Sequence, residues 1–439
     1  MSSRDYFKGK RIAVIGLGPL GEMVADIKFL IRSGALVALY DLRSEDRLKS
    51  HLVLLRALGL ASHVCGSVPS DDLLDMDMII LSHEYPRDSS FLHLAKEKKV
   101  AIEYPETLFF KLAPPITLVG IMGSCGKATV ISMLSPMLET VCRDHEGQGF
   151  FVVDPEDSSG IIAHLKKIKT GDIVLLRIVE AIMKELYDMR VSPQVAVFTT
   201  VPPRGAYRQS PFEILSYQTY NNFVVASDEV VEATHSLSFQ PKGKMLRTKH
   251  TLIPPDWELN GRGSHDRDNA ALALQTARLF KITDEVARPI LESWKSLRGR
   301  LELVKKVKNV EFYNDTASVS GEATLAGMVS LSENRNVVLI FGGAEAGCDY
   351  KYLYRDMPKY ARVVITVPGS GTIRERHAMN KIDHVEVYAA PDIEEAARLA
   401  LEHSRKGDRV LFSPGFEAGG LDCSRKERGE RFVRAVRAL

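Results

Sequence analysis

A lysine at the end of a glycine-rich stretch is the feature of the sequence that most directly suggests chemistry. Residues 120–129 read GIMGSCGKAT, follow an apolar run and open a helical pattern. Backbone N–H groups in such a loop, the positive end of the helix and the ammonium group of Lys127 all suit phosphate oxygens. Only the spacing GxxGK is present, and Ala128 stands where phosphate loops carry the hydroxyl that binds Mg²⁺. A glycine-rich helix start without a ligand is the competing interpretation.

Two further glycine-rich turns are candidates for ligand contacts. Residues 16–21 read GLGPLG, and Asp41 follows twenty residues after the last glycine. Glycines there permit a tight turn and a close approach of backbone N–H groups to a pyrophosphate, so we predict nucleotide or nucleotide-sugar binding, with a bare tight turn as the alternative. Arg43 either contacts a phosphate or is a solvated surface side chain. Residues 342–347, GGAEAG, either approach a ligand closely or form a flexible turn.

Apolar runs alternate with helical patterns along the whole chain, which predicts an α/β fold with parallel sheets covered by helices. Pro114 and Pro115 interrupt this alternation, a new strand starts at residue 116, and a third series begins near Arg298. We therefore predict three domains, at residues 1–113, 114–298 and 299–439. Predicted strands include residues 11–15, 36–40, 78–81, 116–121, 195–200, 301–307, 310–313, 336–341, 361–366 and 409–412, and a helix is predicted at residues 20–31.

Composition excludes several classes of protein. The 439 residues are 45% hydrophobic and 26% charged, which rules out a disordered chain, a collagen and a disulfide scaffold. The 58 Lys and Arg against 56 Asp and Glu leave a net charge of +2, so no global field attracts nucleic acid or an anionic membrane. Without an apolar signal core or a long apolar run, we expect a cytoplasmic protein. Five scattered cysteines indicate reduced thiols and no zinc site.

The order of the motifs resembles that of the Mur ligase family, and within it the enzymes that add D-glutamate to UDP-N-acetylmuramoyl-L-alanine. The resemblance covers essentially the whole chain, and its specificity lies in the order and spacing of motifs that are weak singly. It rests on the first two glycine-rich loops and on the segments HDRDNAA at 265–271, RGRLE at 298–302, NDT at 314–316, GG at 342–343, SP at 413–414 and RG at 428–429.

The resemblance implies a Rossmann-like N-terminal domain for the UDP-sugar, a central P-loop ATPase-like domain and a Rossmann-like C-terminal domain that brings the amino acid. It implies a monomer that uses ATP to phosphorylate the carboxylate of UDP-N-acetylmuramoyl-L-alanine, after which the amine of D-glutamate attacks the acyl phosphate. Alignment of three ligands in a closed, dry site favours such a reaction.

The same resemblance assigns residues to sites. Lys127 is the implied catalytic residue. The implied ATP contacts are Gly123, Ser124, Gly126, Lys127, Thr129, Asn269, Arg300 and Asp315. The implied UDP-sugar contacts are Gly18, Leu20, Gly21, Asp41 and Arg43. A purely structural alternative exists for Asp315, which could form an Asx turn. His265, in the segment 265–271, is either a ligand contact or a helix-capping or surface residue.

The sequence departs from the family mainly where the family holds its metal ions. The family uses a hydroxyl, carboxylates, a histidine and a carbamylated lysine around Mg²⁺, and no lysine occurs here between Lys184 and Lys242. We therefore predict no metal ligands, although the family implies Mg²⁺ as a cofactor. Positions that differ from the family's motifs are Ala128, Arg177, Arg204, Gly205, Ala317, Ala346 and Ala418.

Three functions remain open at this point. The first is the ATP-dependent ligase, in which Arg177 and Arg204 neutralise phosphates in place of Mg²⁺. Glu180 is either a replacement carboxylate or a solvated acid on a helix. The second function is a degenerate member that binds a nucleotide or UDP-sugar without ligation. The third is a dinucleotide-dependent oxidoreductase, which residues 16–21 alone suggest.

Overall fold

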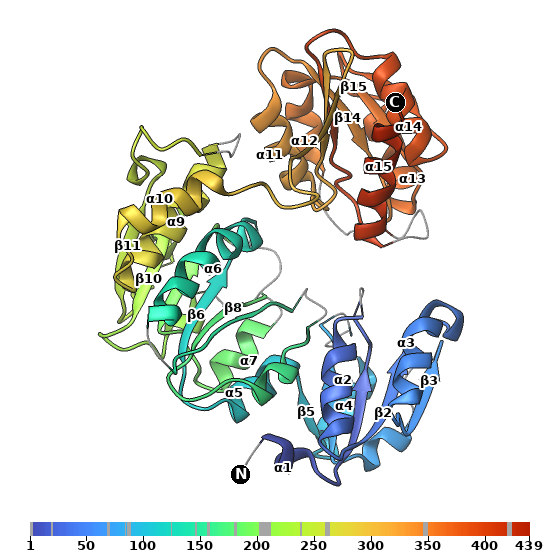
Figure 1. Cartoon of the computed structure of the whole chain (residues 1–439). Helices are drawn as coiled ribbons and strands as arrows, with labels where there is room; N and C mark the ends of the chain where they lie inside the picture. Colours follow the sequence, from blue (N-terminus) through green and yellow to red (C-terminus); the bar gives the residue numbers. More distant parts are fainter. Residues whose placement is uncertain are drawn as a thin grey trace. The chain divides into compact units, whose positions relative to one another are not determined.

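The computed structural model forms two compact units (Figure 1). The first unit contains Met1–Trp257 and Asp268–Leu291, and the second contains Glu258–Arg267 and Glu292–Leu439. The predicted domain boundaries after residues 113 and 298 stay predictions, because this grouping places the first of them inside one unit. The structure describes residues 3–18, 21–67, 71–83, 85, 89–123, 125–144, 147–155, 159–179, 182–201, 212–237, 239–259, 264–345, 350–418 and 424–439.

The first sheet of the first unit is parallel, with the strand order β3-β2-β1-β4-β5. The chain reverses its direction of travel across the sheet between β1 and β4, and ligands of such folds bind at this switch point. The turn at residues 16–18 follows β1 directly. The elements are α1 (Ser3–Phe7), β1 (Arg11–Ile15), α2 (Met23–Arg32), β2 (Leu36–Asp41), α3 (Glu45–Ala57), β3 (Ser62–Cys65), β4 (Met78–Leu81), α4 (Ser90–Glu97), β5 (Ala101–Glu103) and α5 (Pro105–Leu112).

The second sheet of this unit is also parallel, in the order β11-β10-β9-β6-β8-β7. β6 lies between β9 and β8, so the loop that follows β6 is again at a switch point. Pro114 and Pro115 lie in the connection between α5 and β6, as predicted. The elements are β6 (Thr117–Met122), α6 (Lys127–Asp144), β7 (Phe150–Val153), β8 (Ile173–Arg177), α7 (Met183–Asp188), β9 (Val195–Phe198), β10 (Phe223–Ser227), α8 (Asp228–Ser236), β11 (Lys244–Thr248), α9 (Ser264–Leu279) and α10 (Asp284–Ser293).

A buried carboxyl group joins the two sheets of the first unit, whose apolar core is continuous between them. Asp26 on α2 is 1% exposed and accepts hydrogen bonds from the backbone N–H groups of Ile161 at 3.1 Å and Ala163 at 2.9 Å. Burial raises the pKa of Asp26 from 3.8 to about 7 against the effect of those bonds, and the nearby charge of Glu106 adds to the rise. The fully buried Glu106 carboxylate lies 2.8 Å from Nε2 of His83.

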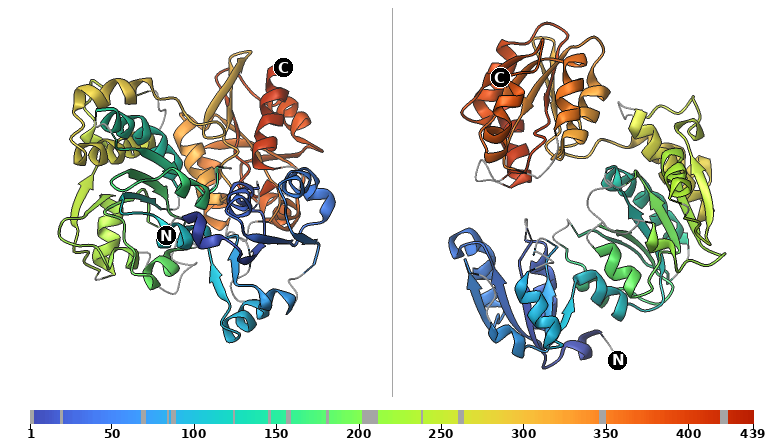
Figure 2. Two further views of the ribbon diagram at one scale, coloured as in Figure 1. Left: turned by 60° about the horizontal axis from the view of Figure 1, so that its bottom comes forward. Right: turned by 180° about the vertical axis from the view of Figure 1, so that it is seen from behind.

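The second unit contains a six-stranded sheet in the order β12-β13-β17-β14-β15-β16, in which only the β12–β13 pair is antiparallel. Alternate residues of β14 enter two cores: Val338 and Ile340 pack with α14 and α15, and Val337 and Leu339 pack with α11 and α12. Figure 2 shows this layered unit from two further directions. The elements are β12 (Glu302–Val307), β13 (Val310–Asn314), α11 (Gly321–Leu331), β14 (Val337–Phe341), α12 (Lys351–Asp356), β15 (Ala361–Thr366), α13 (Ser370–Met379), β16 (Glu386–Ala389), α14 (Ile393–Glu402), β17 (Arg409–Phe412) and α15 (Arg425–Ala438).

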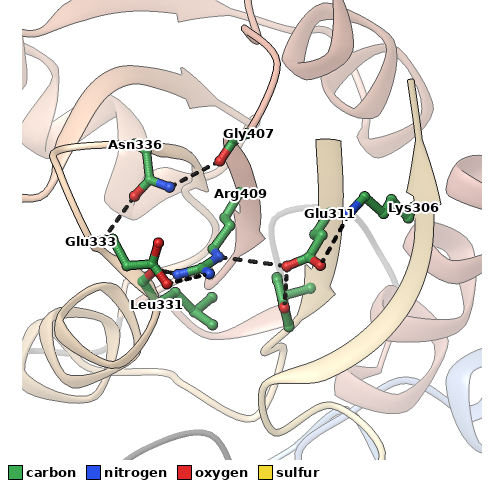
Figure 3. Close-up of polar contacts among 8 residues, drawn as sticks. Lys306, Glu311, Leu331, Glu333, Asn336, Gly407 and Arg409 are labelled. Atoms are coloured by element: carbon green, nitrogen blue, oxygen red, sulfur yellow. Dashed lines mark hydrogen bonds and ion pairs between the residues drawn. The ribbon is translucent and has the colours of Figure 1, made fainter. Parts of the chain in front are cut away.

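Arg409, the first residue of β17, ties the second unit together at the amino end of its strands (Figure 3). Its guanidinium group donates to the carbonyl oxygen of Leu331 at the end of α11 and lies 2.7 Å from Oε1 of Glu333 and 3.5 Å from Oε2 of Glu311. Asn336 donates to the carbonyl oxygen of Gly407 at 3.0 Å. This polar cluster lies at the opposite end of β17 from Ser413, which leaves the carboxyl end for the site described below.

Most predicted boundaries agree with the structure to within one residue, and two differ by more. The helix predicted at residues 20–31 is α2, which begins at Met23, and not at residue 20, because Gly21 adopts φ +78°, outside the helical range. β9 ends at Phe198, and not at residue 200; the hydroxyl groups of Thr199 and Thr200 contact the end of β6 and the loop that follows it. A search of the described helices found none long and apolar enough to span a membrane.

Candidate functional site

The glycine-rich loop after β6 joins a buried strand to the N-terminus of α6. α6 begins at Lys127 and has no acidic residue in its first turn. The unpaired N–H groups of a first helical turn carry partial positive charge and attract anions. The ammonium group of Lys127 donates a hydrogen bond to the carbonyl oxygen of Gly123, which holds the cation at the loop. The loop thus offers backbone donors and one cation to a phosphate group.

Gly123 and Gly126 allow the loop to pack closely against its neighbours. Gly123 has φ +123°, and a Cβ atom there would lie 2.3 Å from Oγ1 of Thr199. Gly126 has φ +82°, and a Cβ atom there would lie 2.6 Å from Oδ1 of Asn269. Both positions therefore require glycine. Asn269, a predicted nucleotide contact, is buried and lies against this loop.

Two threonines that sequence reasoning did not single out brace the loop. The hydroxyl group of Thr199 lies within hydrogen-bonding distance of the carbonyl oxygens of Met122 and Cys125. The backbone N–H of Cys125 donates to Oγ1 of Thr200 at 3.2 Å. Both threonines follow β9, which pairs with β6. The only sequence signal for this brace was a Thr-Thr pair at the end of a predicted strand.

Arg177 lies at the end of β8, directly beside the strand that leads into the loop. Parallel pairing sets Arg177 opposite Ile121 of β6, and sets Leu176 opposite Val153, the last residue of β7. Nη1 of Arg177 is 3.4 Å from each carboxylate oxygen of Asp154, which follows β7. Arg177 is 6% exposed, so the ion pair is largely shielded from water. A carboxylate held by a guanidinium group in this way is a poor metal ligand.

The described side chains around the loop do not fit Mg²⁺, which prefers several oxygen ligands in octahedral geometry. Among residues with described placement, no group of three His, Cys, Asp or Glu side chains could hold a metal ion. Ala128 has no donor, and Thr129, a predicted ATP contact, is only 7% exposed. Predicted positions that lie outside the described residues are Leu20, Ser124, Glu180, Arg204, Gly205, Ala346 and the side chain of His265.

The structure brings four of the predicted UDP-sugar residues, Gly18, Gly21, Asp41 and Arg43, together at the turn after β1. Gly18 and Gly21 adopt φ of +77° and +78°, and Asp41 ends the neighbouring strand β2. Asp41 accepts the backbone N–H of Leu17 at 2.9 Å and hydrogen bonds from Arg43 at 2.9 and 2.7 Å. Burial would raise the pKa of Asp41, but these hydrogen bonds outweigh burial and lower the pKa. Asp41 therefore fixes the turn and Arg43.

A carboxylate also lies against this turn. A Cβ atom at Gly18 would be 2.2 Å from Oε2 of Glu22, the residue that precedes α2. An anionic ligand at the turn would therefore meet the negative charge of Glu22 as well as the N–H groups of the backbone. Sequence reasoning missed this acid because it has no place in the glycine pattern.

Asp315 lies in a buried hydrogen-bond network of the second unit. Its Oδ2 atom accepts from the hydroxyl groups of Ser318 at 2.7 Å and Ser413 at 2.8 Å, and its Oδ1 atom accepts from the N–H of Leu301 at 3.2 Å. Burial raises the pKa of Asp315 to about 6, although these bonds and the positive charge of Arg300 oppose the rise. Asp315, predicted as a nucleotide contact, thus joins the regions around β12, β13 and β17, with Arg300 nearby.

Two local features of the second unit bear on alternatives that the sequence left open. The Asx turn expected at Asp315 forms one residue earlier, where Oδ1 of Asn314 accepts the N–H of Thr316 at 3.3 Å. The double glycine approaches the chain's own backbone, because a Cβ atom at Gly343 would lie 2.4 Å from the carbonyl oxygen of Glu417.

Comparison with known proteins adds independent information to this geometry. Residues 299–416 match the family model described as Mur ligase, glutamate ligase domain. The chain is 27% identical over 472 residues to the UDP-N-acetylmuramoylalanine–D-glutamate ligase of Roseiflexus sp. (strain RS-1), with 98% of this chain and 99% of the relative covered. The C-terminal part of the chain thus matches the Mur ligase family, and nearly the whole chain is similar to members of that family. A ligase of the same name from Clostridioides difficile (strain 630) is 26% identical over 98% of this chain and 99% of its own.

Solved structures of Mur ligases share the fold. MurC from Thermotoga maritima gives a TM-score of 0.61 at 16% identity and covers 98% of this chain and 99% of its own. MurF from Thermotoga maritima, determined in complex with ADP, gives 0.55 at 17% identity and covers 99% of this chain and 96% of its own. These matches confirm the predicted α/β Mur ligase fold.

Proposed function

We propose that this chain uses ATP to join D-glutamate to UDP-N-acetylmuramoyl-L-alanine in peptidoglycan precursor synthesis. The names of relatives that span nearly the whole chain support this substrate pair. The ADP complex of a fold neighbour supports the choice of nucleotide. The observation that carries the proposal is the loop after β6, where Lys127 and the N-terminus of α6 converge. A monomer acting in the cytoplasm is part of the proposal.

In the proposed reaction, ATP transfers its terminal phosphoryl group to the carboxylate of the UDP-sugar, and the amine of D-glutamate then displaces phosphate from the acyl phosphate. Lys127 neutralises charge on the transferred group, which makes it the proposed catalytic residue. Gly123, Gly126 and Asn269 shape the nucleotide loop, and Ser124 belongs to the same loop. We assign Thr129 and Asp315 positioning roles because both are buried, and Arg300 a phosphate contact.

The proposed UDP-sugar site is the turn after β1. Backbone N–H groups around Gly18, Leu20 and Gly21 bind the pyrophosphate, and Arg43 contacts a phosphate while Asp41 holds it in place. On this proposal residues 1–113 hold the sugar nucleotide, residues 114–298 hold ATP and residues 299–439 bring the amino acid. The family implies Mg²⁺, but the described donor set does not fit it, so no step of this mechanism is assigned to a metal ion.

A second candidate function is binding of a nucleotide or UDP-sugar without ligation. The ion pair between Arg177 and Asp154 favours it, because it places a guanidinium group where the family has a metal-binding acid. Ala317 and Ala418 likewise lack the polar groups of the family's motifs.

Phosphate release separates the two functions. The full-length chain is incubated with ATP, UDP-N-acetylmuramoyl-L-alanine and D-glutamate, with each component omitted in turn, and with either MgCl₂ or EDTA. If the chain is a ligase, phosphate release should require all three substrates, proceed at about 1–10³ per second and be lost in Lys127→Ala. Nucleotide binding without substrate-dependent release would reject the ligase and leave the binding function. The matched control Lys184→Ala removes an exposed lysine on α7 and should retain the wild-type rate.

A further inference from the structure

We infer that the site at the loop after β6 binds its nucleotide without a divalent cation, with Arg177 and Lys127 neutralising the phosphate charge. The inference rests on the proposed nucleotide site and specifies its metal requirement. It concerns binding, so it can hold whether or not the chain ligates.

The strand register places Arg177 at the phosphate edge of the sheet. Arg177 is paired with Ile121, two residues before Gly123, where the loop begins. The carboxyl ends of parallel strands meet at one edge, so the end of β8 lies next to the start of the loop. On its other side, β8 pairs with β7, whose end leads into Asp154. The guanidinium group therefore belongs to the edge at which the loop would receive a phosphate.

The charges at this edge oppose a divalent cation. Asp154, the carboxylate that pairs with Arg177, has both oxygens 3.4 Å from Nη1 of Arg177. A metal ion bound to Asp154 would lie close to that guanidinium, in a region where only 6% of Arg177 is exposed to screening water. The hydroxyl group of Thr199 lies within hydrogen-bonding distance of the carbonyl oxygens of Met122, at the end of β6, and of Cys125 in the loop. The side-chain oxygens of these two described residues, which Mg²⁺ would otherwise prefer as ligands, are thus already engaged by the protein.

The same arrangement suits a metal-free phosphate chain. A guanidinium group carries several N–H donors in one plane, so it can serve Asp154 and a phosphate oxygen together. Lys127 provides a second cation at the loop. The first turn of α6 contains no acid that would oppose the incoming anion. Free ADP carries the charge that this set of donors accepts, whereas the magnesium complex of ADP has part of that charge already neutralised.

Calorimetric titration of the full-length chain with ADP, in excess EDTA and in excess MgCl₂, tests the inference. We expect the dissociation constant in EDTA to equal that in MgCl₂ or to be lower. An affinity about tenfold or more weaker in EDTA would overturn the inference while leaving the proposed function intact. Absence of binding in both buffers would overturn the inference and the nucleotide site together. Binding in EDTA without phosphate release in the preceding assay would uphold the inference and reject the ligase.

Variants test the role assigned to Arg177. Arg177→Gln should weaken ADP binding in EDTA by about tenfold or more, and Arg177→Glu should also make the remaining affinity depend on MgCl₂. Arg143→Gln removes one exposed positive charge from the last turn of α6 and should change neither affinity nor metal response. Thermal melting of each variant checks folding. Equal affinities of folded Arg177→Gln and Arg143→Gln would remove Arg177 from the proposal. The titration of the wild-type chain in EDTA and in MgCl₂ tests metal-free binding independently of these variants.

Discussion

The buried carboxyl group of Asp26 should make the stability of the first unit fall as the pH rises from 5 to 8. The pKa of Asp26 is about 7 in the folded chain, against 3.8 for an ordinary aspartate. Between these values the unfolded chain has lost the proton and the folded chain keeps it. Because stability falls with pH wherever the folded state binds more protons, deprotonation favours unfolding throughout this window.

The size of the effect follows from the two pKa values. Each unit of difference corresponds to about 1.4 kcal/mol once both states are ionised. At pH 5 the unfolded state has gained only part of this energy, and at pH 8 it has gained nearly all of it. The linkage relation gives a decrease of about 3 kcal/mol in the free energy of unfolding between pH 5 and pH 8. Asp26→Asn cannot ionise and should lack this decrease.

Denaturant unfolding followed by tryptophan fluorescence measures this difference. The chain has two tryptophans, and buried Trp257 reports on the first unit when Trp294 of the second unit is replaced by phenylalanine. The wild-type and Asp26→Asn chains are compared in this background at several pH values. Glu106 and His83 are present in both chains, so their contributions largely cancel. If the two chains lost the same stability between pH 5 and pH 8, to within about 0.5 kcal/mol, the assignment of a raised pKa to Asp26 would be wrong.

Three further outcomes are expected. Gly123→Ala should weaken ADP binding by about tenfold or more, because its Cβ would lie 2.8 Å from the backbone nitrogen of Thr200. The control Gly171→Ala, with φ +90° and nothing within 4 Å of its Cβ, should leave the affinity measured by calorimetry unchanged. Equal effects of the two changes would refute the packing argument. Glu22→Gln should strengthen UDP binding about three- to tenfold by removing a charge beside the turn, and an unchanged titration would place the pyrophosphate elsewhere. Ser413→Ala should lower the free energy of unfolding by about 1.5–3 kcal/mol at pH 7.5 and by less at pH 5, because the Ser413 hydroxyl stabilises ionised Asp315. Denaturant unfolding followed by Trp294 fluorescence measures both values. A loss of stability that is the same at both pH values would contradict this assignment.

The glycine loops and the strands that carry them were predictable from sequence because they depend on local rules. A buried parallel strand is a short apolar run, and the turn after it needs glycine where φ is positive, as at Gly18 and Gly123. Helix starts were less predictable. Helix α2 begins three residues later than predicted, because the positive φ at Gly21 outweighs the apolar periodicity of the residues around it.

The partners of the site residues were not predictable, because they depend on which strands become neighbours. Arg177 and Asp154 are 23 residues apart, and only the pairing of β7 with β8 brings them together. Asp315 is 98 residues from Ser413, and its environment exists only once β13 and β17 pair. The sequence singled out Arg177 and Asp315 as candidate contacts of the nucleotide, whereas the structure shows both already paired with protein groups, Arg177 with Asp154 and Asp315 with Ser413.

The exchange at the end of β8 has a simple electrostatic meaning. Where the resemblance to the family places an acidic residue, this chain has Arg177, so the side-chain charge at that position differs by two positive units. That difference equals the charge of one Mg²⁺ ion. A site built in this way can present an equal positive charge to a phosphate chain without the ion, but the charge is fixed to β8 and to Asp154 and cannot follow a phosphoryl group as it moves. Binding and phosphoryl transfer therefore make different demands on Arg177. Retained nucleotide affinity in EDTA and substrate-dependent turnover must be measured separately, because the first can persist where the second has been lost.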